Sequence, residues 1–453
     1  FKLFGATLMS NSETKKTTPK ERIRPISGFP EWLPEYRLVE LQWIDSLRRV
    51  FESYGFTSIE PRSIEPVEVL LKQGDTDKEI YAIGRLLGDN DNELEPSYAL
   101  HYDMTVPMAR YVAANMNQLN FPFKRYQIQK AWRGERPQDG RFREFLQCDI
   151  DVVDTRPIPS HFDAEIPIIM HEAIESIGAG PLTTKINNRK ILEGFYLGLG
   201  VSDTTNIIRI IDKLDKIGAD GVTTMLSSEL ELSATTIDKI LNLATIKGSG
   251  EIVINQIKDL DVKSDLLHAG LNELKFVMHQ LEKYKNGTFL VDMSIARGLA
   301  YYTGTVYESR FTNYPEFPTI CGGGRYDNLV GDFVNKKLPG IGISIGLTRI
   351  FAKLMKEGKI RPTQKTPTEI LVVHTQNASY DFIKDTADLL RSRGFNVEQY
   401  HEDRKLKAQL KYADEKMIPW IWFPPKRPND PHEVKNSKTR DQNIADPKTW
   451  LPN

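Results

Sequence analysis

Apolar residues recur every three or four positions in several stretches of the chain, which is the spacing of one face of an α-helix. The first such stretch runs from Leu38 to Phe56 and predicts a helix. Residues 97–114 indicate a strand that leads into a second helix. Residues 122–153 differ, because two strand-like runs there are joined by a charged loop that contains glycine and proline. This segment is therefore predicted to be a β-hairpin.

The middle of the chain has a different pattern. No proline lies between Leu182 and Tyr314, and residues 201–288 show repeated helical spacing. We expect a mostly helical insertion, flanked by strands near 183–187 and 289–295. Strand character then returns and extends to Ile345, and a further helix is expected up to about Gly358.

A linker rich in proline, threonine and lysine, RPTQKTPT at 361–368, marks the clearest domain boundary. Beyond it, predicted strands and helices alternate. Strands are expected at 369–374, in FNVEQY and in IPWIWF, with helices over 378–393 and 404–416. Such alternation is typical of a small α/β domain.

Composition narrows the class of protein. The chain has 453 residues, with 60 Lys plus Arg against 61 Asp plus Glu, so nucleic acid binding would need local basic clusters. No apolar run approaches the length of a membrane-spanning helix. Cys148 and Cys321 have no CxxC partner, which disfavours a disulfide scaffold or structural zinc and suits a reducing cytosol. Because HExxH is also absent, we expect no protein-held metal.

The polar N-terminal stretch has two interpretations. A mitochondrial transit peptide is one, but Glu13 and Glu21 and the scarcity of arginine argue against it. The favoured expectation is a flexible segment over residues 1–24, with Met9 as the true initiator.

Nucleotide-binding fingerprints are mostly missing. There is no GxxxxGK[ST] motif, and GIGISIG at 340–346 places Ile345 where a dinucleotide-binding loop needs its third glycine. The alternation of glycine and isoleucine better describes a strand whose glycine side allows close approach to its backbone. Arg349 lies near the start of the helix that follows. Tight packing of this strand on that helix is the alternative reason for the glycines.

The predicted hairpin has the highest concentration of charged and polar residues that could bind a ligand. Residues 124–143 carry seven basic residues against Glu135 and Asp139, a local net charge of +5. A solvated charged hairpin would also have this composition. In the return strand, however, Gln147, Asp149 and Asp151 alternate and so share one face. Such a hairpin suits a guanidinium on a triphosphate and carboxylates at a polar substrate.

The hairpin sequence YQIQKAWRGERPQDGRFREFLQCDIDVV resembles motif 2 of class II aminoacyl-tRNA synthetases, and within that class the histidyl-tRNA synthetase family. Other segments agree in order. IARGLAYYTGTVYE (295–308) is similar to the family's histidine-specific peptide, CGGGRYDNLV (321–330) to its glycine-rich strand and turn, and GIGISIGLTRI (340–350) to motif 3. Helix 38–54 resembles motif 1, and KLKAQLKYADEKMIPW (405–420) resembles part of the anticodon-binding domain.

The resemblance implies an α+β fold. A class II catalytic domain with an antiparallel sheet would span residues 25–360, with the helical insertion at about 195–288. After the linker, residues 369–453 would form an α/β anticodon-binding domain. The class I signatures, HIGH-like and KMSKS-like, are absent.

The resemblance also implies which residues bind ATP. Activation of an amino acid joins two anions, so the site must supply fixed positive charge. Arg133 would hold the α-phosphate, Arg297 would face it from the opposite side, and Arg349 would bind the γ-phosphate. Glu135 and Arg141 would act in the ATP-binding hairpin and its loop.

A histidine pocket must offer partners to one ring donor and one ring acceptor. The residues that the resemblance implies for the ring and the α-ammonium group are Asp151, Tyr302, Tyr326, Asp103, Thr105 and Gln147. Two alternatives stay open: Tyr301 and Tyr302 in the core, and Asp103 as a helix cap. Many family members carry an acid where this chain has Ala300, and FPPKRPND (423–430) replaces the usual glycine-containing turn.

The implied protein is a cytoplasmic, homodimeric histidine–tRNA ligase that uses ATP with Mg²⁺, L-histidine and tRNA(His), dimerises through the motif 1 region and binds no membrane. A non-catalytic paralogue, such as the regulatory subunit of ATP phosphoribosyltransferase, is the alternative from another class. That subunit lacks the C-terminal domain and tends to lose the ATP-binding arginines, which this chain keeps. A generic tRNA-binding protein would leave Arg133, Arg297 and Arg349 unexplained.

Overall fold

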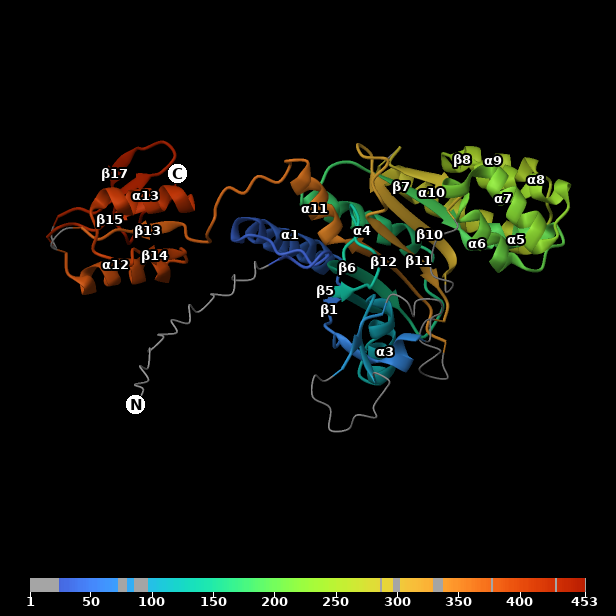
Figure 1. The fold of residues 1–453 in the computed structure, drawn as a ribbon, viewed down its shortest axis with the longest axis horizontal. Coiled ribbons are helices and arrows are strands. Elements are labelled where there is room, and N and C mark those ends of the chain that lie inside the picture. The colour runs from blue at the N-terminus through green and yellow to red at the C-terminus, as the bar shows by residue number, and fades with distance from the viewer. Residues whose placement is uncertain are drawn as a thin grey trace, which may run out of the picture.

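A computed structural model describes residues 24–71, 80–84, 97–285, 287–295, 302–328, 337–375, 378–427 and 430–452. Figure 1 shows a central body built around a large sheet, a cluster of helices at one end of it, and a separate unit at the C-terminus that is joined by an extended segment.

The large sheet has nine strands in the order β1-β5-β6-β12-β11-β10-β7-β9-β8. It is antiparallel except where β1 pairs with β5 and β7 with β9. Its strands are β1 (Thr57–Ser58), β5 (Phe123–Trp132), β6 (Glu144–Val153), β12 (Gly340–Gly346), β11 (Cys321–Tyr326), β10 (Tyr302–Phe311), β7 (Leu182–Asn188), β9 (Phe289–Asp292) and β8 (Lys247–Gly248). The predicted hairpin is confirmed, since β5 pairs with β6 from Phe123–Val153 to Trp132–Glu144.

The two faces of this sheet differ in chemistry. On β6, Cys148, Ile150 and Val152 point to one side and are buried in the main core. Three helices cover that side: α1 (Pro34–Ser53), α4 (Phe162–Ser176) and α11 (Leu347–Lys356). Each large apolar side chain buried there stabilises the fold by about 1.5–3 kcal/mol. The alternate β6 residues face the other side of the sheet, which leaves polar groups over a surface lined by glycine-rich β11 and β12.

A small three-stranded sheet lies beside the polar face. It has the order β2-β4-β3, with β2 (Ile64–Pro66), β4 (Tyr98–Leu100) and β3 (Ala82–Ile83), and α2 (Val67–Leu70) follows β2. After β4 the chain enters α3 (Thr105–Asn115), as the sequence predicts. The backbone N–H of Trp132 donates to the carbonyl of His101, so this segment is joined to the end of β5.

Within the described residues between β7 and β9, where a helical insertion is predicted, there are six helices. They are α5 (Arg189–Gly198), α6 (Thr204–Ile211), α7 (Leu214–Leu230), α8 (Ala234–Thr245), α9 (Gly250–Asp259) and α10 (Asp265–Tyr284). Polar side chains begin several of them, since Asn188, Asp203, Ser233 and Ser264 each accept a backbone N–H of the first turn. The first helix begins at Arg189, a few residues before the predicted start.

The C-terminal unit has a five-stranded sheet, β14-β13-β15-β16-β17. Parallel strands β13 (Ile370–Val372), β14 (Val397–Gln399) and β15 (Trp420–Phe423) alternate with α12 (Tyr380–Ser392) and α13 (Leu406–Lys416), which confirms the predicted alternation. Two antiparallel strands, β16 (Glu433–Asn436) and β17 (Gln442–Ile444), were not predicted. Trp422 is fully buried at the centre of this unit.

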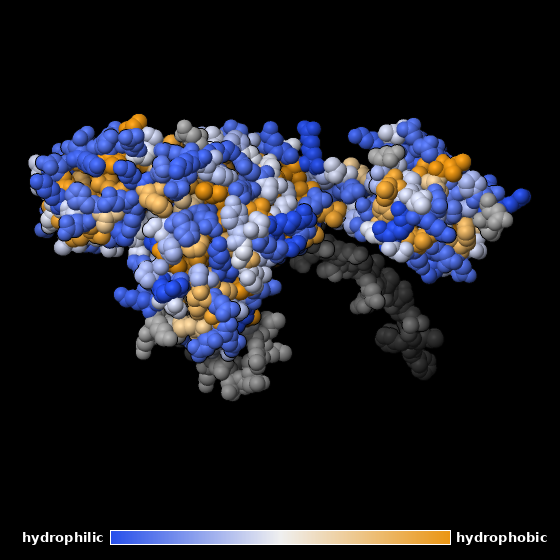
Figure 2. Space-filling model, turned by 180° about the vertical axis from the view of Figure 1, so that it is seen from behind, coloured by the Kyte–Doolittle hydropathy of each residue, from blue (hydrophilic) through white to orange (hydrophobic). Residues whose placement is uncertain are grey.

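The face of the molecule opposite to that of Figure 1 is mostly hydrophilic, with small separate apolar patches over the body and the C-terminal unit (Figure 2). Among the described residues, no helix is long and apolar enough to cross a membrane.

Candidate active site

The loop of the β5–β6 hairpin has a defined shape. The backbone N–H of Arg133 donates to the carbonyl of Arg143, and Gln138 and Arg141 form a bridge between them. The N–H groups of Arg143 and Glu144 both donate to the carbonyl of Gly28, at 2.8 and 3.1 Å. The segment that precedes α1 therefore supports the base of this loop.

A cavity of about 260 Å³ lies between the hairpin and the strands that carry the glycines. Its walls come from β6, β11, β12, the hairpin loop and the start of α11. They include Arg133, Glu135, Gly140, Phe142, Phe145, Gln147, Thr319, Gly322, Ser344 and Arg349. We call it the larger cavity.

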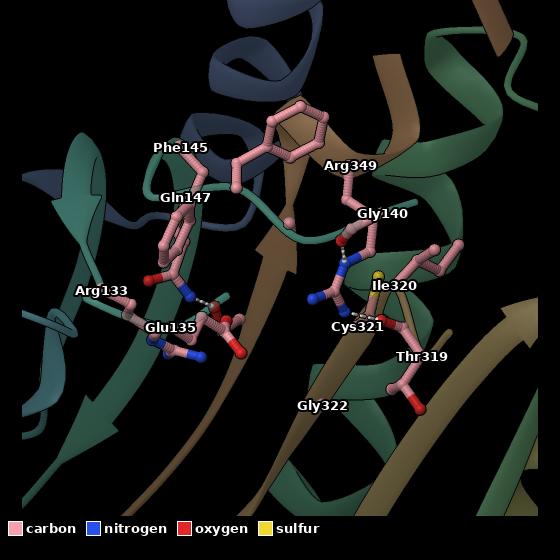
Figure 3. A pocket seen from close by; sticks show the side chains of 13 residues that line it. Arg133, Glu135, Gly140, Phe145, Gln147, Thr319, Ile320, Cys321, Gly322 and Arg349 are labelled. Carbon is pink, nitrogen blue, oxygen red and sulfur yellow. Dashed lines mark hydrogen bonds between the residues drawn. The ribbon is translucent and has the colours of Figure 1, made fainter. Parts of the chain in front are cut away.

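Arg133 and Arg349 reach into the larger cavity from opposite walls (Figure 3). The Nε of Arg133 donates to the carbonyl of Tyr102 at 3.0 Å, and its guanidinium carbon lies 5.2 Å from the ring centre of Phe145. Arg349 donates through Nε to the carbonyl of Gly140 at 2.5 Å and through a terminal nitrogen to the carbonyl of Thr319. Both guanidinium groups are thus held in position before any ligand binds.

The electrostatics of the larger cavity favour an anion. Burial, which disfavours the cationic form, and repulsion from the neighbouring charges of Arg133 and Arg141 lower the pKa of Arg349. Glu135 lines the same cavity, but its carboxylate accepts from Arg141 at 3.0 Å. An anion between the two arginines would relieve their mutual repulsion.

A second, smaller cavity of about 30 Å³ adjoins the first, because Gly322 and Ser344 line both. Its other walls come from Thr105 at the start of α3 and from β6, β10, β11 and β12. They are Asp149, Asp151, Tyr302, Gly324, Tyr326, Gly342 and Ile343. We call it the smaller cavity.

Asp151 is the centre of a buried polar group at the end of the smaller cavity. The Tyr326 hydroxyl donates to Asp151 Oδ1 at 2.9 Å, and a guanidinium nitrogen of Arg125, itself fully buried, lies 2.5 Å from Oδ2. Burial raises the pKa of Asp151 to about 7, and Arg125 opposes that rise.

Glycines of β12 leave room for this group. A Cβ at Gly342 would lie 2.1 Å from Asp151 Oδ1, and one at Gly340 would lie 2.4 Å from the Tyr326 ring. The sequence predicts close approach to this strand, and the groups that approach are the carboxylate of Asp151 and the phenol of Tyr326.

Two further carboxyl groups lie near by. Burial raises the pKa of both Asp103 and Asp149 to about 6. The helix-cap interpretation of Asp103 is confirmed for one oxygen, because Oδ1 accepts the backbone N–H of Val106 at 3.2 Å. Its Oδ2 is buried and has no hydrogen-bond partner in the described part of the chain.

The structure brings together most of the residues singled out from the sequence. Those around the larger cavity are Arg133, Glu135, Gln147 and Arg349, with Arg141 bound to Glu135 at its edge. Those around the smaller cavity are Thr105, Asp151, Tyr302 and Tyr326. Asp103 is buried beside them and interacts electrostatically with Arg133. Arg297, together with Ala300 and Tyr301, lies outside the described residues.

Two residues of the site were not singled out from the sequence: Phe145 and Arg125. Asp149 is where the sequence predicts it, on the face of β6 that also carries Gln147, and the same alternation places Phe145 there, so its position could have been inferred. Arg125 was counted only as part of the local charge, because its pairing with Asp151 depends on the strand register.

Residues 28–350 match the family model described as histidyl-tRNA synthetase. The chain belongs to this family. The histidine–tRNA ligase of Thermobifida fusca is 52% identical over 429 residues, which cover 95% of this chain and 98% of that protein. The crystal structure of histidyl-tRNA synthetase from Nostoc sp. PCC 7120 superimposes with a TM-score of 0.83 at 36% identity, covering 94% of this chain and 97% of that one.

A more distant neighbour within the same fold is described as an ATP phosphoribosyltransferase regulatory subunit/histidyl-tRNA synthetase from Bacillus halodurans C. It has a TM-score of 0.71 at 19% identity and covers 87% of this chain and 97% of its own. This likeness shows the shared fold alone. The histidyl-tRNA synthetase family thus accounts for the sequence and the fold over nearly the whole chain.

Proposed function

We propose that the chain is a histidine–tRNA ligase, which activates L-histidine with ATP and then transfers the histidyl group to tRNA(His). One observation carries the proposal beyond family membership. A cavity with two opposed guanidinium groups adjoins a cavity that ends in a buried carboxylate and phenol. The first suits a triphosphate and the second suits an imidazole ring.

In the first step, a carboxylate oxygen of histidine attacks the α-phosphorus of ATP. A carbon–oxygen–phosphorus link forms, the bond between the α-phosphorus and the bridging oxygen breaks, and pyrophosphate leaves with the electron pair. Negative charge builds on the phosphoryl oxygens. By resemblance we assign Arg133 to the α-phosphate and Arg349 to the γ-phosphate, and their positions on opposite walls of the larger cavity support a shared triphosphate ligand. Arg297 is assigned to the α-phosphate by resemblance.

The second step needs no charged side chains beyond those that already bind ATP. The terminal adenosine hydroxyl of tRNA attacks the activated carbonyl carbon, its proton passes to a phosphate oxygen of the adenylate, and AMP leaves as its bond to that carbon breaks. AMP is a good leaving group because its phosphate is stabilised by the same arginines that bound ATP.

The smaller cavity provides the selectivity for histidine. We assign Asp151 as the acceptor of a ring N–H, with its orientation fixed by Tyr326 and Arg125. Tyr302 is assigned to the second ring nitrogen, and Gln147 to the polar groups at the boundary of the two cavities. A pocket that binds a substrate N–H strongly rejects analogues without one, because the buried carboxylate would stay unpaired.

Phe145 is assigned as the surface on which the adenine base stacks, since its ring lines the larger cavity beside Arg133. Mg²⁺ is expected to enter with ATP. Among the described residues there is no group of three acidic, histidine or cysteine side chains to hold a metal ion. The phosphates and water would therefore supply most of its ligands, as is usual for Mg²⁺ with nucleotides.

The remaining assignments concern the whole protein. We propose that residues 25–360 form the catalytic domain with the helical insertion at about 195–288, and that 369–453 form the anticodon-binding domain. The C-terminal sheet flanked by helices supports the second assignment. A cytoplasmic location fits two buried free cysteines, Cys148 and Cys321, which form no disulfide.

A homodimer through the motif 1 region is also proposed. Helix α1 and the hairpin border a cleft of about 710 Å³, lined by residues that include Leu41, Ile44 and Ile59. Leu41 is 43% exposed, and β1 is a two-residue strand at the edge of the sheet. A second copy of the chain would cover both.

Light scattering tests the dimer. The wild type should have about twice the chain mass of 51.8 kDa, and Leu41→Glu should lower the measured mass towards one chain. Ile444→Glu changes a residue that is 74% exposed in the C-terminal unit and is the matched control. A dimer that is unaffected by Leu41→Glu would contradict this interface.

Amino-acid-dependent exchange of pyrophosphate into ATP tests the catalytic assignment. Arg297→Ala should abolish histidine-dependent exchange while the protein stays folded. Arg209→Ala, which removes a surface arginine of α6 that is paired with Glu229, is the matched control. Near-normal exchange in Arg297→Ala would refute the role given to Arg297.

A further inference from the structure

Asp149 has a buried carboxylate with unused hydrogen-bonding capacity. The residue is 4% exposed and lines the smaller cavity from β6. Its partner is the hydroxyl of Ser344, on the neighbouring strand β12. The other oxygen, Oδ1, is buried and has no hydrogen-bond partner among the described residues. An unpaired buried acceptor destabilises the folded state, so a ligand donor at this place would be favoured.

The charges around the smaller cavity also favour a cation. Three buried carboxyl groups, of Asp103, Asp149 and Asp151, lie within electrostatic range of one another. Arg125, which is fully buried, contacts Asp151, and Arg133 interacts electrostatically with Asp103 and Asp149. With a neutral imidazole at Asp151, three carboxyl groups would face two arginines, which leaves a net negative charge. The α-ammonium group of an amino acid carries the charge that is needed.

The position of Asp149 along β6 matches that of the α-ammonium. Gln147 lines the larger cavity, and Asp151 contacts Tyr326 at the far end of the smaller one. Asp149 lies between them, about 7 Å from each along the strand. In histidine, the Cα and its ammonium group lie between the carboxylate, which must face ATP, and the ring.

We propose that Asp149 is a further substrate-binding residue, which accepts a hydrogen bond from the α-ammonium group of histidine through Oδ1. The inference rests on the proposed function, because it takes histidine as the occupant of the smaller cavity. The competing explanation is a structural one, in which Asp149 only balances the charge of Arg125 inside the sheet. That explanation assigns no partner to Oδ1 of Asp149.

Asp149→Asn keeps the shape of the side chain and removes its charge. In the pyrophosphate exchange assay, the KM for histidine should rise about 10- to 100-fold. This is the loss of affinity expected when one charge-assisted hydrogen bond is removed. The KM for ATP should change less than about threefold, because Asp149 does not line the larger cavity. Asp238→Asn makes the same chemical change on the surface of α8 and is the control.

Calorimetric titration separates the ammonium group from the ring and needs no turnover. Histidinol carries both, whereas 4-methylimidazole carries the ring alone. In Asp149→Asn, histidinol should bind about 10- to 100-fold more weakly, while 4-methylimidazole, measured by displacement of histidinol, changes less than about threefold.

Three results would overturn the proposal. These are an unchanged KM for histidine, an equal loss for histidinol and 4-methylimidazole, and a parallel rise of both KM values with a lower unfolding temperature. The last result would identify a structural residue. Failure of the proposed function is a separate outcome, because it would appear in the wild type as exchange that does not depend on histidine.

Discussion

The glycine at 342 gives the sharpest test of how the smaller cavity is built. A methyl group at this position would lie 2.1 Å from Asp151 Oδ1, 2.4 Å from Asp151 Cγ and 2.6 Å from the carbonyl oxygen of Ile150. The Ile150 carbonyl belongs to the backbone and cannot rotate away, whereas the Asp151 side chain can. In Gly342→Ala the Asp151 carboxylate must therefore move, and this carboxylate is the group that we assign as the partner of the imidazole.

The size of the effect follows from two sources. Forcing an extra methyl group into a packed site costs about 1–3 kcal/mol of stability. Displacing the carboxylate weakens a hydrogen bond to a charged group, which lowers kcat/KM for histidine by about 10- to 100-fold. The KM for ATP should change little, since Gly342 does not line the larger cavity.

Denaturant unfolding and pyrophosphate exchange measure these two effects. Gly322→Ala in the neighbouring strand is the matched control for stability, because the nearest atom to its added methyl would be the Tyr307 carbonyl oxygen at 3.7 Å. That variant should be as stable as the wild type or slightly more stable. If Gly342→Ala were equally harmless and kept its kcat/KM for histidine, the contact between Asp151 and β12 would not exist as described.

Three further predictions concern charge. Arg349→Ala should lower kcat/KM for ATP by about 100-fold in the exchange assay, with less than a threefold change in the KM for histidine; equal losses for both substrates would refute its place at the γ-phosphate. Arg110→Met should lower stability by roughly 1–3 kcal/mol in urea unfolding, because Arg110 contacts the fully buried Glu65 at 2.7 Å while Arg62 stays paired with the other carboxylate oxygen; Arg48→Met, at an exposed pair, should leave the unfolding midpoint nearly unchanged. Burial raises the pKa of Asp149 to about 6, so between about pH 4 and 6 the folded state holds a proton that the unfolded state has lost. The stability from this group is present below about pH 4 and is lost as the pH rises through 6, a change of roughly 2–3 kcal/mol in all. Asp149→Asn should lack this part of the pH dependence in urea unfolding between pH 4 and 7, and an unchanged profile would contradict it.

The β5–β6 hairpin shows which features of the site can be predicted from a sequence pattern. Alternation along β6 places Gln147 and Asp151 on one face, and the structure finds them there. Alternation does not predict which residue of an adjacent strand contacts a given side chain. The ion pair of Arg125 with Asp151 and the approach of Tyr326 depend on register and on the glycines of β12.

The parts that were missed have physical reasons. Phe145 in a strand has the pattern of an ordinary core residue, and its role becomes visible only when Arg133 is seen beside its ring. Strands β16 and β17 are short and contain mostly polar residues, so no apolar alternation marks them. Strand β16 is specified by pairing with β15, and β17 by pairing with β16, which the sequence pattern alone does not reveal.

The most direct test of the central claim is the exchange of radioactive pyrophosphate into ATP by the wild-type protein, with each of the twenty amino acids in turn. We predict exchange with histidine and only background with the other nineteen, followed by transfer of histidine to tRNA(His) when that tRNA is added. Exchange that is absent with histidine, or equally strong with another amino acid, would contradict the assignment of the two adjoining cavities to ATP and histidine.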